Sequence, residues 1–158
     1  MARLRSIQRR LARFRQAEAS KKALAIEALA WLAIARLGLL VVPFPRLARL
    51  IGDFVSPGDP RVARAHAGAS PEQAALAATI GRIVADVARA APFRAVCLPQ
   101  ALAARAMLAR RGVASVLYFG AARGEDKPFD AHAWLDAAGV EVTGYPVAHD
   151  FTEIACFV

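Results

Sequence analysis

The sequence contains few of the residues that build metal sites or disulfide frameworks. It has only two cysteines, Cys97 and Cys156, and they form no CxxC pair. The histidines His66 and His149 have no companion at metal-ligand spacing. A glycine-rich phosphate loop is also missing. We therefore expect a protein without a bound metal and without a cofactor.

The pattern of a secretory signal is lacking as well. The basic start of the chain is not followed directly by a compact apolar stretch and a small-residue cleavage site. We therefore expect a cytoplasmic protein in which both thiols are free. The 158 residues contain no repeats and no low-complexity tract, which predicts one domain with an appended helical segment.

Acidic residues are nearly absent from the first 22 positions. This segment holds eight arginines and lysines against one acid, Glu18, and so carries +7 of the formal charge of +8. Such an arm suits an anionic membrane surface, RNA or an acidic protein partner, while a solvated helix face is the plainer alternative. Aromatic residues are almost missing among the basic ones, apart from Phe14, so we expect no nucleic acid partner.

The longest apolar run covers residues 23–42 and is long enough to be tested as a membrane span. Glu27 and Arg36 interrupt it, and each charge costs about 2.5 to 3.5 kcal/mol near the centre of a bilayer. The run therefore predicts a buried helix or one that lies on a membrane surface.

Helical patterns occupy the first two thirds of the chain. An apolar stripe of Leu4, Ile7, Leu11 and Phe14 is typical of a basic docking helix. Ser20 is placed to cap the next helix, and Ser70, Pro71 and Gln73 form a capping-box pattern for a later one. The predicted helices cover residues 3–18, 20–40, 47–54, 71–91 and 97–111.

After Gly112 the apolar period changes from helical to extended. Residues 113–120 are apolar on both faces, as in a central strand, and residues 129–136 and 140–145 are two shorter strand candidates. The chain therefore predicts an α+β fold with helices first and a small antiparallel sheet last. We assign residues 1–22 to a basic amphipathic arm and residues 23–158 to one domain with a helical lead-in over 23–91.

Cys97 lies at the predicted start of a helix, two residues before Pro99. A helix N-terminus favours the thiolate that attacks carbonyl carbon, Arg94 adds a nearby cation, and first-turn N–H groups can hold an oxyanion. The alternative is a packing role, because cysteine is among the most buried residue types. Gln100 is a further polar candidate near such an oxyanion, although a surface position on the first turn suits it better.

His132 is the one histidine inside a clear strand pattern. Alternation places Asp130, His132, Trp134 and Asp136 on one face of the strand and Ala131 with its apolar neighbours on the other. Such a face fits either an exposed sheet surface or the floor of a cleft. The order of cysteine, helix, strand and histidine is that of a papain-like or transglutaminase-like site, in which the imidazole deprotonates the thiol.

Four sequence stretches resemble one particular protein family. The stretches "CLPQALAARAMLARRG", "VLYFGAARGEDKPFDAHAWLD" and "GVEVTG" resemble the leader peptidases of lasso-peptide biosynthesis, the B proteins with a transglutaminase-like cysteine-peptidase fold. The upstream stretch "EALAWLAIARLGLLVVPFPRLARLIG" is similar to the helical lead-in of that family, so the resemblance covers roughly residues 27–154.

The resemblance implies a cysteine endopeptidase that removes the leader from a ribosomally made precursor peptide. It matches Cys97 to the nucleophile and His132 to the general base. It also implies three partners: the precursor, a separate leader-recognition protein and a macrolactam cyclase. An ATP requirement of the maturation complex stays open. The basic arm adds membrane-surface contact, so that the protein would be cytoplasmic or peripheral at the inner membrane surface.

The group that orients His132 is harder to assign. A turn that pairs Asp136 with Val140 would place Gly144 opposite His132, and glycine has no side chain to offer. The alternatives are Asp136, Asp130, Asp150, a backbone carbonyl or water. We predict Asp136 as the third catalytic residue because it is the last residue of the stretch "FDAHAWLD".

Two other residues are expected to serve packing. Trp134 is predicted to pack against the helix that begins at Cys97, and Cys156 is interpreted as a core residue. The missing acid at Gly144 and the basic arm also support another hypothesis, a catalytically degenerate scaffold or membrane-associated adaptor with the same fold.

Overall fold

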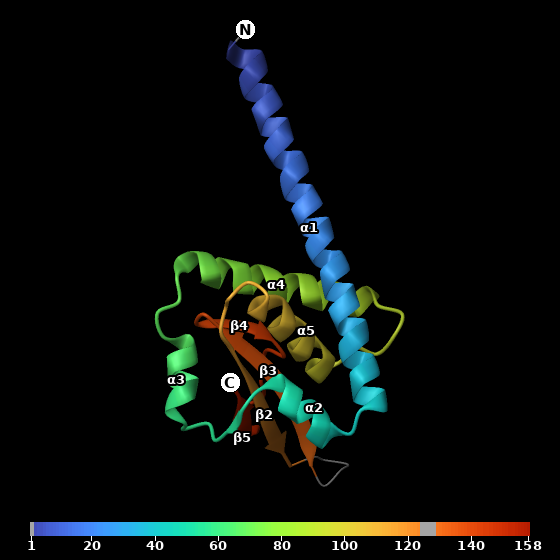
Figure 1. Ribbon diagram of the computed structural model, residues 1–158, viewed down its shortest axis with the longest axis vertical. Coiled ribbons are helices and arrows are strands. Elements are labelled where there is room, and N and C mark those ends of the chain that lie inside the picture. The colour runs from blue at the N-terminus through green and yellow to red at the C-terminus, as the bar shows by residue number, and fades with distance from the viewer. Residues whose placement is uncertain (1, 124–128) are drawn as a thin grey trace.

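The computed structural model describes residues 2–123 and 129–158, with side chains from Glu18 onward. The helices are α1 (Ala2–Val41), α2 (Phe44–Ile51), α3 (Pro60–His66), α4 (Pro71–Ala90) and α5 (Cys97–Ala109). The strands are β1 (Phe54–Val55), β2 (Ser115–Ala122), β3 (Asp130–Ala137), β4 (Val140–Thr143) and β5 (Thr152–Phe157). Helices α1, α4 and α5 pack against one side of a small antiparallel sheet (Figure 1), which confirms the predicted α+β fold.

One continuous helix, α1, replaces the two that the sequence predicts. The prediction of a break at Ser20 was wrong, because no glycine or proline occurs before Gly38 and a serine inside a helix costs only about 0.5 kcal/mol. The N-terminal half of α1 projects away from the rest of the molecule (Figure 1). The predicted stripe of Leu4, Ile7, Leu11 and Phe14 lies outside the side chains that the structure describes.

The sheet has the strand order β1-β5-β2-β3-β4, and each neighbouring pair is antiparallel. The strand predicted over residues 113–120 is β2, two residues later in the chain. The sequence reading missed β1, β5 and α3, and it placed α2 three residues too late. The short apolar segment that includes Cys156 forms β5 because it pairs with the central strand β2, at Tyr118.

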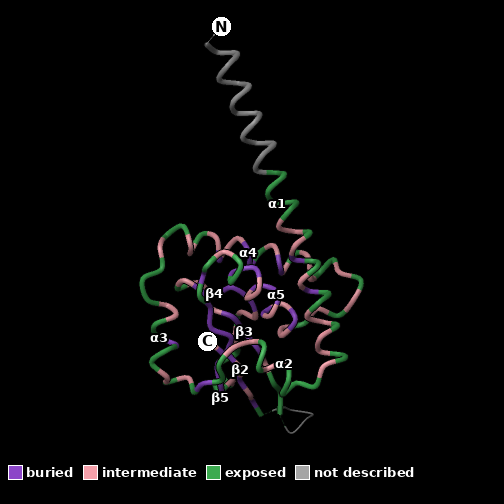
Figure 2. Tube along the Cα trace, in the orientation of Figure 1, coloured by how far each residue is buried: buried purple, intermediate pink, exposed green. Residues whose placement is uncertain are grey.

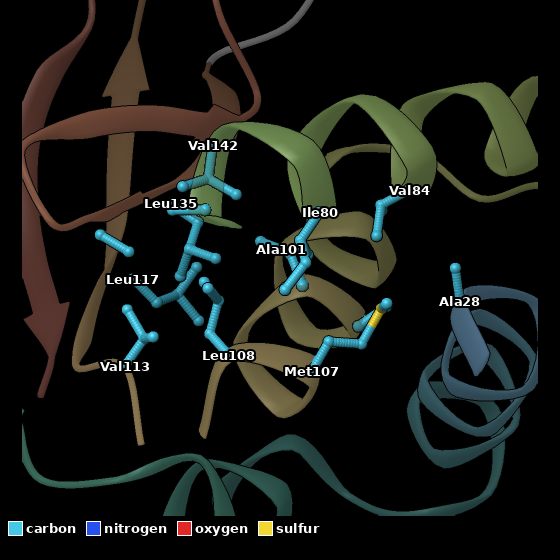
Figure 3. Close-up of a cluster of buried hydrophobic side chains, with 14 of the residues drawn as sticks. Ala28, Ile80, Val84, Ala101, Met107, Leu108, Val113, Leu117, Leu135 and Val142 are labelled. Atoms are coloured by element: carbon cyan, nitrogen blue, oxygen red, sulfur yellow. The ribbon is translucent and has the colours of Figure 1, made fainter. Parts of the chain in front are cut away.

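The main hydrophobic core lies between the sheet and α1, α4 and α5 (Figure 3). Leu117 and Leu135 enter it from the sheet, and Met107 and Ile80 enter it from α5 and α4. These residues are fully buried, whereas most of α1 is exposed or half-buried (Figure 2). The core therefore holds the N-terminal end of α5 firmly over one face of the sheet.

A second cluster covers the opposite face of the sheet. It contains Tyr118 and Trp134 from β2 and β3, Cys156 from β5, and Val62 from α3. The prediction that Trp134 packs against α5 was wrong, because strand alternation turns this side chain away from the helix-covered face. The packing role of Cys156 is confirmed, since this residue is fully buried.

Local signals position α4 as the sequence predicts. Ser70 Oγ accepts a hydrogen bond from the Gln73 amide at 3.3 Å, and Gln73 Oε1 accepts one from the Ser70 amide at 3.0 Å. This reciprocal capping box satisfies two backbone donors that the helix itself leaves free.

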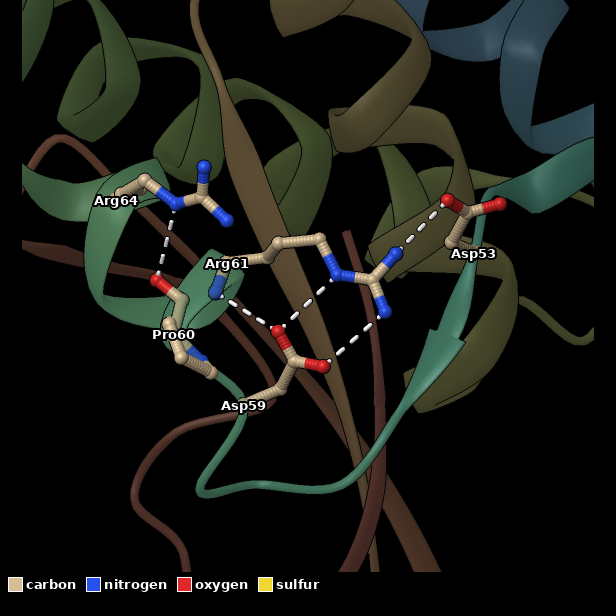
Figure 4. Close-up of polar contacts among 5 residues, drawn as sticks. All are labelled: Asp53, Asp59, Pro60, Arg61 and Arg64. Carbon is tan, nitrogen blue, oxygen red and sulfur yellow. Dashed lines mark hydrogen bonds and ion pairs between the residues drawn. The ribbon is translucent and has the colours of Figure 1, made fainter.

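An exposed charged cluster fixes the start of α3 (Figure 4). Asp59 accepts a hydrogen bond from the Arg61 amide at 2.8 Å, and the Arg61 guanidinium binds both carboxylate oxygens of Asp59 at 3.1 Å. The same guanidinium contacts Asp53 at 3.0 Å. The bidentate contact lowers the pKa of Asp59, and the cluster ties α3 to the segment before β1.

Half-buried Arg105 of α5 joins three parts of the fold. Its guanidinium donates to the carbonyl oxygens of Ile51 at 3.1 Å, Ser115 at 2.7 Å and Phe157 at 3.2 Å. These carbonyls end α2, begin β2 and end β5, respectively. Through these contacts, the Arg105 side chain fixes the position of α5 relative to α2 and the sheet.

Candidate active site

Cys97 is the first residue of α5 and is half-buried. Its side chain packs with the main core, on the helix-covered face of the sheet. The Gln100 amide group donates to the carbonyl of Ala95 at 2.7 Å and so closes the loop in front of the helix. Because helix geometry leaves the N–H groups of Cys97 and Leu98 without acceptors inside the helix, both can serve a developing oxyanion.

Arg94, the expected cation, is exposed three residues before the thiol. Gln100, expected at the surface, is half-buried, and its amide group is already engaged by the loop. The polar groups available at the thiol are therefore the backbone N–H groups at the start of α5.

His132 lies near the start of β3, and its ring is surrounded by aromatic side chains. The ring centroid lies 5.9 Å from that of Trp134 and 5.5 Å from that of Phe151. His132 Nε2 lies 2.6 Å from the carbonyl oxygen of Gly144. Because a carbonyl can only accept, Nε2 carries the proton, and Nδ1 of the neutral ring has a free lone pair.

The predicted register between β3 and β4 was wrong by one residue. The structure pairs Ala137 with Val140 and Asp136 with Glu141, with an irregularity before Asp136. Ala138 and Gly139 form the tight turn, and both have positive φ angles, of 53° and 73°. This is the left-handed pair that a two-residue hairpin requires.

Gly144 is required by the space around it. Its φ angle is +85°, and a Cβ atom there would lie 2.5 Å from the carbonyl oxygen of Ala133 and 2.8 Å from Trp134 Cβ. No side chain, acidic or otherwise, fits this position. The backbone carbonyl of Gly144 takes the contact with the imidazole, which is one of the alternatives left open by the sequence.

Asp136 does not contact His132 in the described residues. Its carboxylate accepts a hydrogen bond from the hydroxyl of Tyr145. Burial raises the pKa of Asp136, and Glu141 adds to this, while the Tyr145 hydroxyl and His66 act in the opposite direction. Asp130 and Asp150, the other acidic candidates, are exposed.

An aromatic row continues from His132 across the sheet. Trp134 stacks on Tyr118, with ring centroids 5.7 Å apart and planes inclined by 6°. The Tyr118 hydroxyl lies 3.2 Å from His66 Nε2, and burial raises the pKa of Tyr118 to about 12. The sequence reading missed Tyr118, Tyr145 and His66 because they join this network only through strand pairing and the placement of α3.

The thiol and the imidazole lie on different faces of the sheet. Cys97 packs with the helix-covered core, whereas His132 stacks with the aromatic row on the other face. No hydrogen bond joins the two residues in the part of the chain that the structure describes. The fold therefore brings His132, Gly144, Tyr145 and Asp136 together and leaves the Cys97 contact unformed.

The second thiol is poorly suited to nucleophilic chemistry. Burial raises the pKa of Cys156 to about 11, and Glu153 contributes to the shift. Within residues 2–123 and 129–158 there is no group of three or more His, Cys, Asp or Glu side chains placed to hold a metal ion. Cys97 is thus the better placed of the two thiols for reaction.

A cysteine at the start of a core-packed helix and a histidine on a strand of an antiparallel sheet are parts of an α+β fold. Residues 38–156 match the model of the transglutaminase-like superfamily. The match spans more than half of the chain, and the protein belongs to this superfamily. No curated protein and no solved structure matches the chain.

Proposed function

We propose that the protein is a cysteine peptidase that uses Cys97 as nucleophile and His132 as general base. The observation that carries the proposal is the hydrogen bond from His132 Nε2 to the Gly144 carbonyl, within a member of the transglutaminase-like superfamily. This bond fixes the ring and leaves Nδ1 as the basic atom, which is the state that a proton acceptor needs.

In the proposed reaction, His132 Nδ1 takes the proton of the Cys97 thiol, and the thiolate attacks the carbonyl carbon of the scissile amide. The N–H groups at the start of α5 bind the oxyanion of the tetrahedral intermediate. His132 then protonates the leaving amine as the C–N bond breaks, and water hydrolyses the thioester. The step requires a rearrangement in the substrate complex that brings Sγ and Nδ1, which lie on different faces of the sheet, to hydrogen-bond distance.

Asp136 has an indirect role in this proposal. It holds the hydroxyl of Tyr145, the residue that follows Gly144, and so fixes the carbonyl that orients His132. Asp136 is then a positioning residue, and the direct partner of the imidazole is the backbone.

The proposed substrate is the precursor of a lasso peptide, cleaved between leader and core. The resemblance of the Cys97 helix start and of the stretch "FDAHAWLD" to the lasso-peptide leader peptidases supports this substrate class. A separate leader-recognition protein would present the scissile bond, and a macrolactam cyclase would use the freed amine.

The test is leader removal by the full chain, measured by mass spectrometry with precursor and leader-recognition protein present. Cys97→Ala should abolish cleavage, whereas Cys156→Ala, the matched change at the other cysteine, should retain it. Cleavage at the wild-type rate by Cys97→Ala would refute the proposed nucleophile. Cleavage of unrelated peptides but not of the precursor would refute the substrate class alone.

A non-catalytic scaffold is the second candidate, favoured by the position of Cys97 and His132 on different faces of the sheet. In that case His132→Gln should leave the alkylation rate of Cys97 unchanged. If the imidazole activates the thiol, the same change should slow alkylation about tenfold or more.

A further inference from the structure

We propose that the outer face of α1, over residues 23–41, lies on an anionic membrane surface. The proposal concerns the outer face of α1, which carries neither Cys97 nor His132, and does not depend on the proposed function. It rests on the exposed side chains of α1, on the way its other face is held, and on the charge beside it.

The outer face of α1 is apolar and uncovered. Eight of the twelve large hydrophobic side chains that are exposed in the described residues lie between residues 26 and 50. On α1, Ile26 is 70% exposed, Leu37 60% and Val41 68%. Together with Ala30 and Ala33 they recur at helical spacing, so they form one stripe along the helix. A soluble domain rarely leaves so long an apolar stripe without a partner surface.

The inner face of the same segment is firmly docked. Ala28 and Leu32 are fully buried in the main core. Glu27 forms a bidentate ion pair with Arg111, two residues after the end of α5, at 2.6 and 3.1 Å, and contacts Arg110 at 3.2 Å. The segment Glu18–Val41 is long and apolar enough to cross a membrane. Spanning would leave Glu27 unpaired in hydrocarbon, so the docked helix favours a position in the plane of the interface.

Positive charge adjoins the apolar stripe. Residues 1–22 carry eight basic side chains against one acid. Lys21 and Lys22 of α1 and Arg82 of α4 line a groove of about 540 Å³ between the two helices, and Asp86 is the one acidic residue among the described side chains of its wall. An apolar face flanked by lysine and arginine is the pattern of helices that lie at anionic lipid headgroups.

A second copy of the chain is a poorer occupant for this face. Two copies packed through α1 would bring two segments of net charge +7 together, which is unfavourable without a polyanion between them. A lipid surface supplies both the apolar layer for Ile26 and Leu37 and the phosphate groups for the basic side chains.

Flotation of the full chain with vesicles tests this inference. One set contains phosphatidylglycerol and phosphatidylcholine, and the other contains phosphatidylcholine alone. We expect binding to the anionic set, about tenfold or more weaker at high salt. The double variant Ile26→Ser/Leu37→Ser should reduce binding about tenfold or more, because it removes apolar area from the stripe without touching the core.

The matched control is Ile154→Ser on β5, since Ile154 is exposed to a similar extent, 62%, on another element. It should bind vesicles like the wild type, and circular dichroism should show that all variants fold. Equal binding by the double variant and the wild type would overturn the proposal. So would self-association, or capture by a purified protein partner, that depends on Ile26 and Leu37 while vesicles are not bound. Resistance of the vesicle-bound protein to alkaline extraction would overturn the in-plane position in favour of a span.

Discussion

The carbonyl oxygen of Gly144 lies 2.6 Å from Nε2 of His132 and is the hydrogen-bond partner that holds the imidazole. Gly144 can take this role because its φ angle of +85° directs the backbone toward β3 at a point where a Cβ atom would strike Ala133. A backbone carbonyl thus orients His132, and the nearby carboxylate of Asp136 binds the hydroxyl of Tyr145.

Gly144→Ala should destabilise the protein and lower its activity. The strained φ angle alone costs about 1 to 3 kcal/mol, and the overlap with Ala133 and Trp134 adds to it. Gly139→Ala is the control, because Gly139 also has a positive φ angle, of +73°, but faces open space. It should cost about 1 kcal/mol in urea unfolding and leave cleavage intact. Equal costs at the two positions would contradict the close approach at Gly144.

Alkylation should distinguish the two cysteines in the folded protein. Cys97 is half-buried at the helix start, whereas Cys156 is fully buried and burial raises its pKa to about 11. With iodoacetamide at pH 8, peptide mapping should find Cys97 modified at least about a hundredfold faster than Cys156. In denaturant the two cysteines should be alkylated at equal rates. Comparable alkylation rates in the native protein as well would show that burial does not protect Cys156.

Tyr145→Phe should impair catalysis more than binding. It removes the hydroxyl that binds Asp136 and so loosens the segment that carries the Gly144 carbonyl. We expect kcat to fall about tenfold with KM little changed, and stability to fall by about 1 to 2 kcal/mol. The pH profile of kcat/KM should also shift, since the imidazole loses its fixed acceptor. A variant with an unaltered profile and kcat would assign Tyr145 to packing alone.

Asp136→Asn tests how the carboxylate of Asp136 contributes to the pH dependence of the free energy of unfolding. Burial raises the pKa of Asp136 in the folded state above its ordinary value of 3.8, so the folded protein holds this proton more tightly than the unfolded chain. The contribution of Asp136 to stability therefore falls as pH rises from about 3.8 through the folded-state pKa. Urea unfolding from pH 4 to 7 should find this decline smaller in the variant. A steeper decline in the variant would reverse the sign of the argument.

Glu27→Gln should weaken the docking of α1. The bidentate contact with Arg111 lowers the pKa of Glu27, so its stabilising contribution is present above pH 4.5 and is lost as pH falls through the folded-state value. We expect a loss of about 1 to 2 kcal/mol at pH 7. Glu18→Gln is the control, because Glu18 forms only an exposed pair with Lys21 at 4.0 Å. The difference between Glu27→Gln and the wild type should shrink as pH falls through the folded-state pKa of Glu27.

Several elements of this fold are predictable from neighbouring residues. The capping box of Ser70 and Gln73 starts α4, and a period-two pattern correctly separates the two faces of β3. These features depend on hydrogen bonds and side-chain directions within one element, which the local sequence encodes directly. The α+β class follows from the same local patterns in chain order.

The rest of the site depends on contacts between distant segments. The observed pairing of β3 with β4 differs by one residue from the predicted register, and Asp136 binds Tyr145, a residue beyond β4, instead of His132. The strand around Cys156 exists because it pairs with β2, and the role of His66 arises only once α3 places it beside Tyr118.

The sequence by itself determined the helix that begins at Cys97, the strand that carries His132 and the excess of positive charge near the start of the chain. Only the tertiary structure decided that a glycine carbonyl orients the histidine, that Cys97 and His132 lie on different faces of the sheet, and that one side of α1 stays uncovered. The physical reason is that propensity and periodicity act within a few residues. Cβ clearance, sheet register and burial are set by segments that meet only after folding.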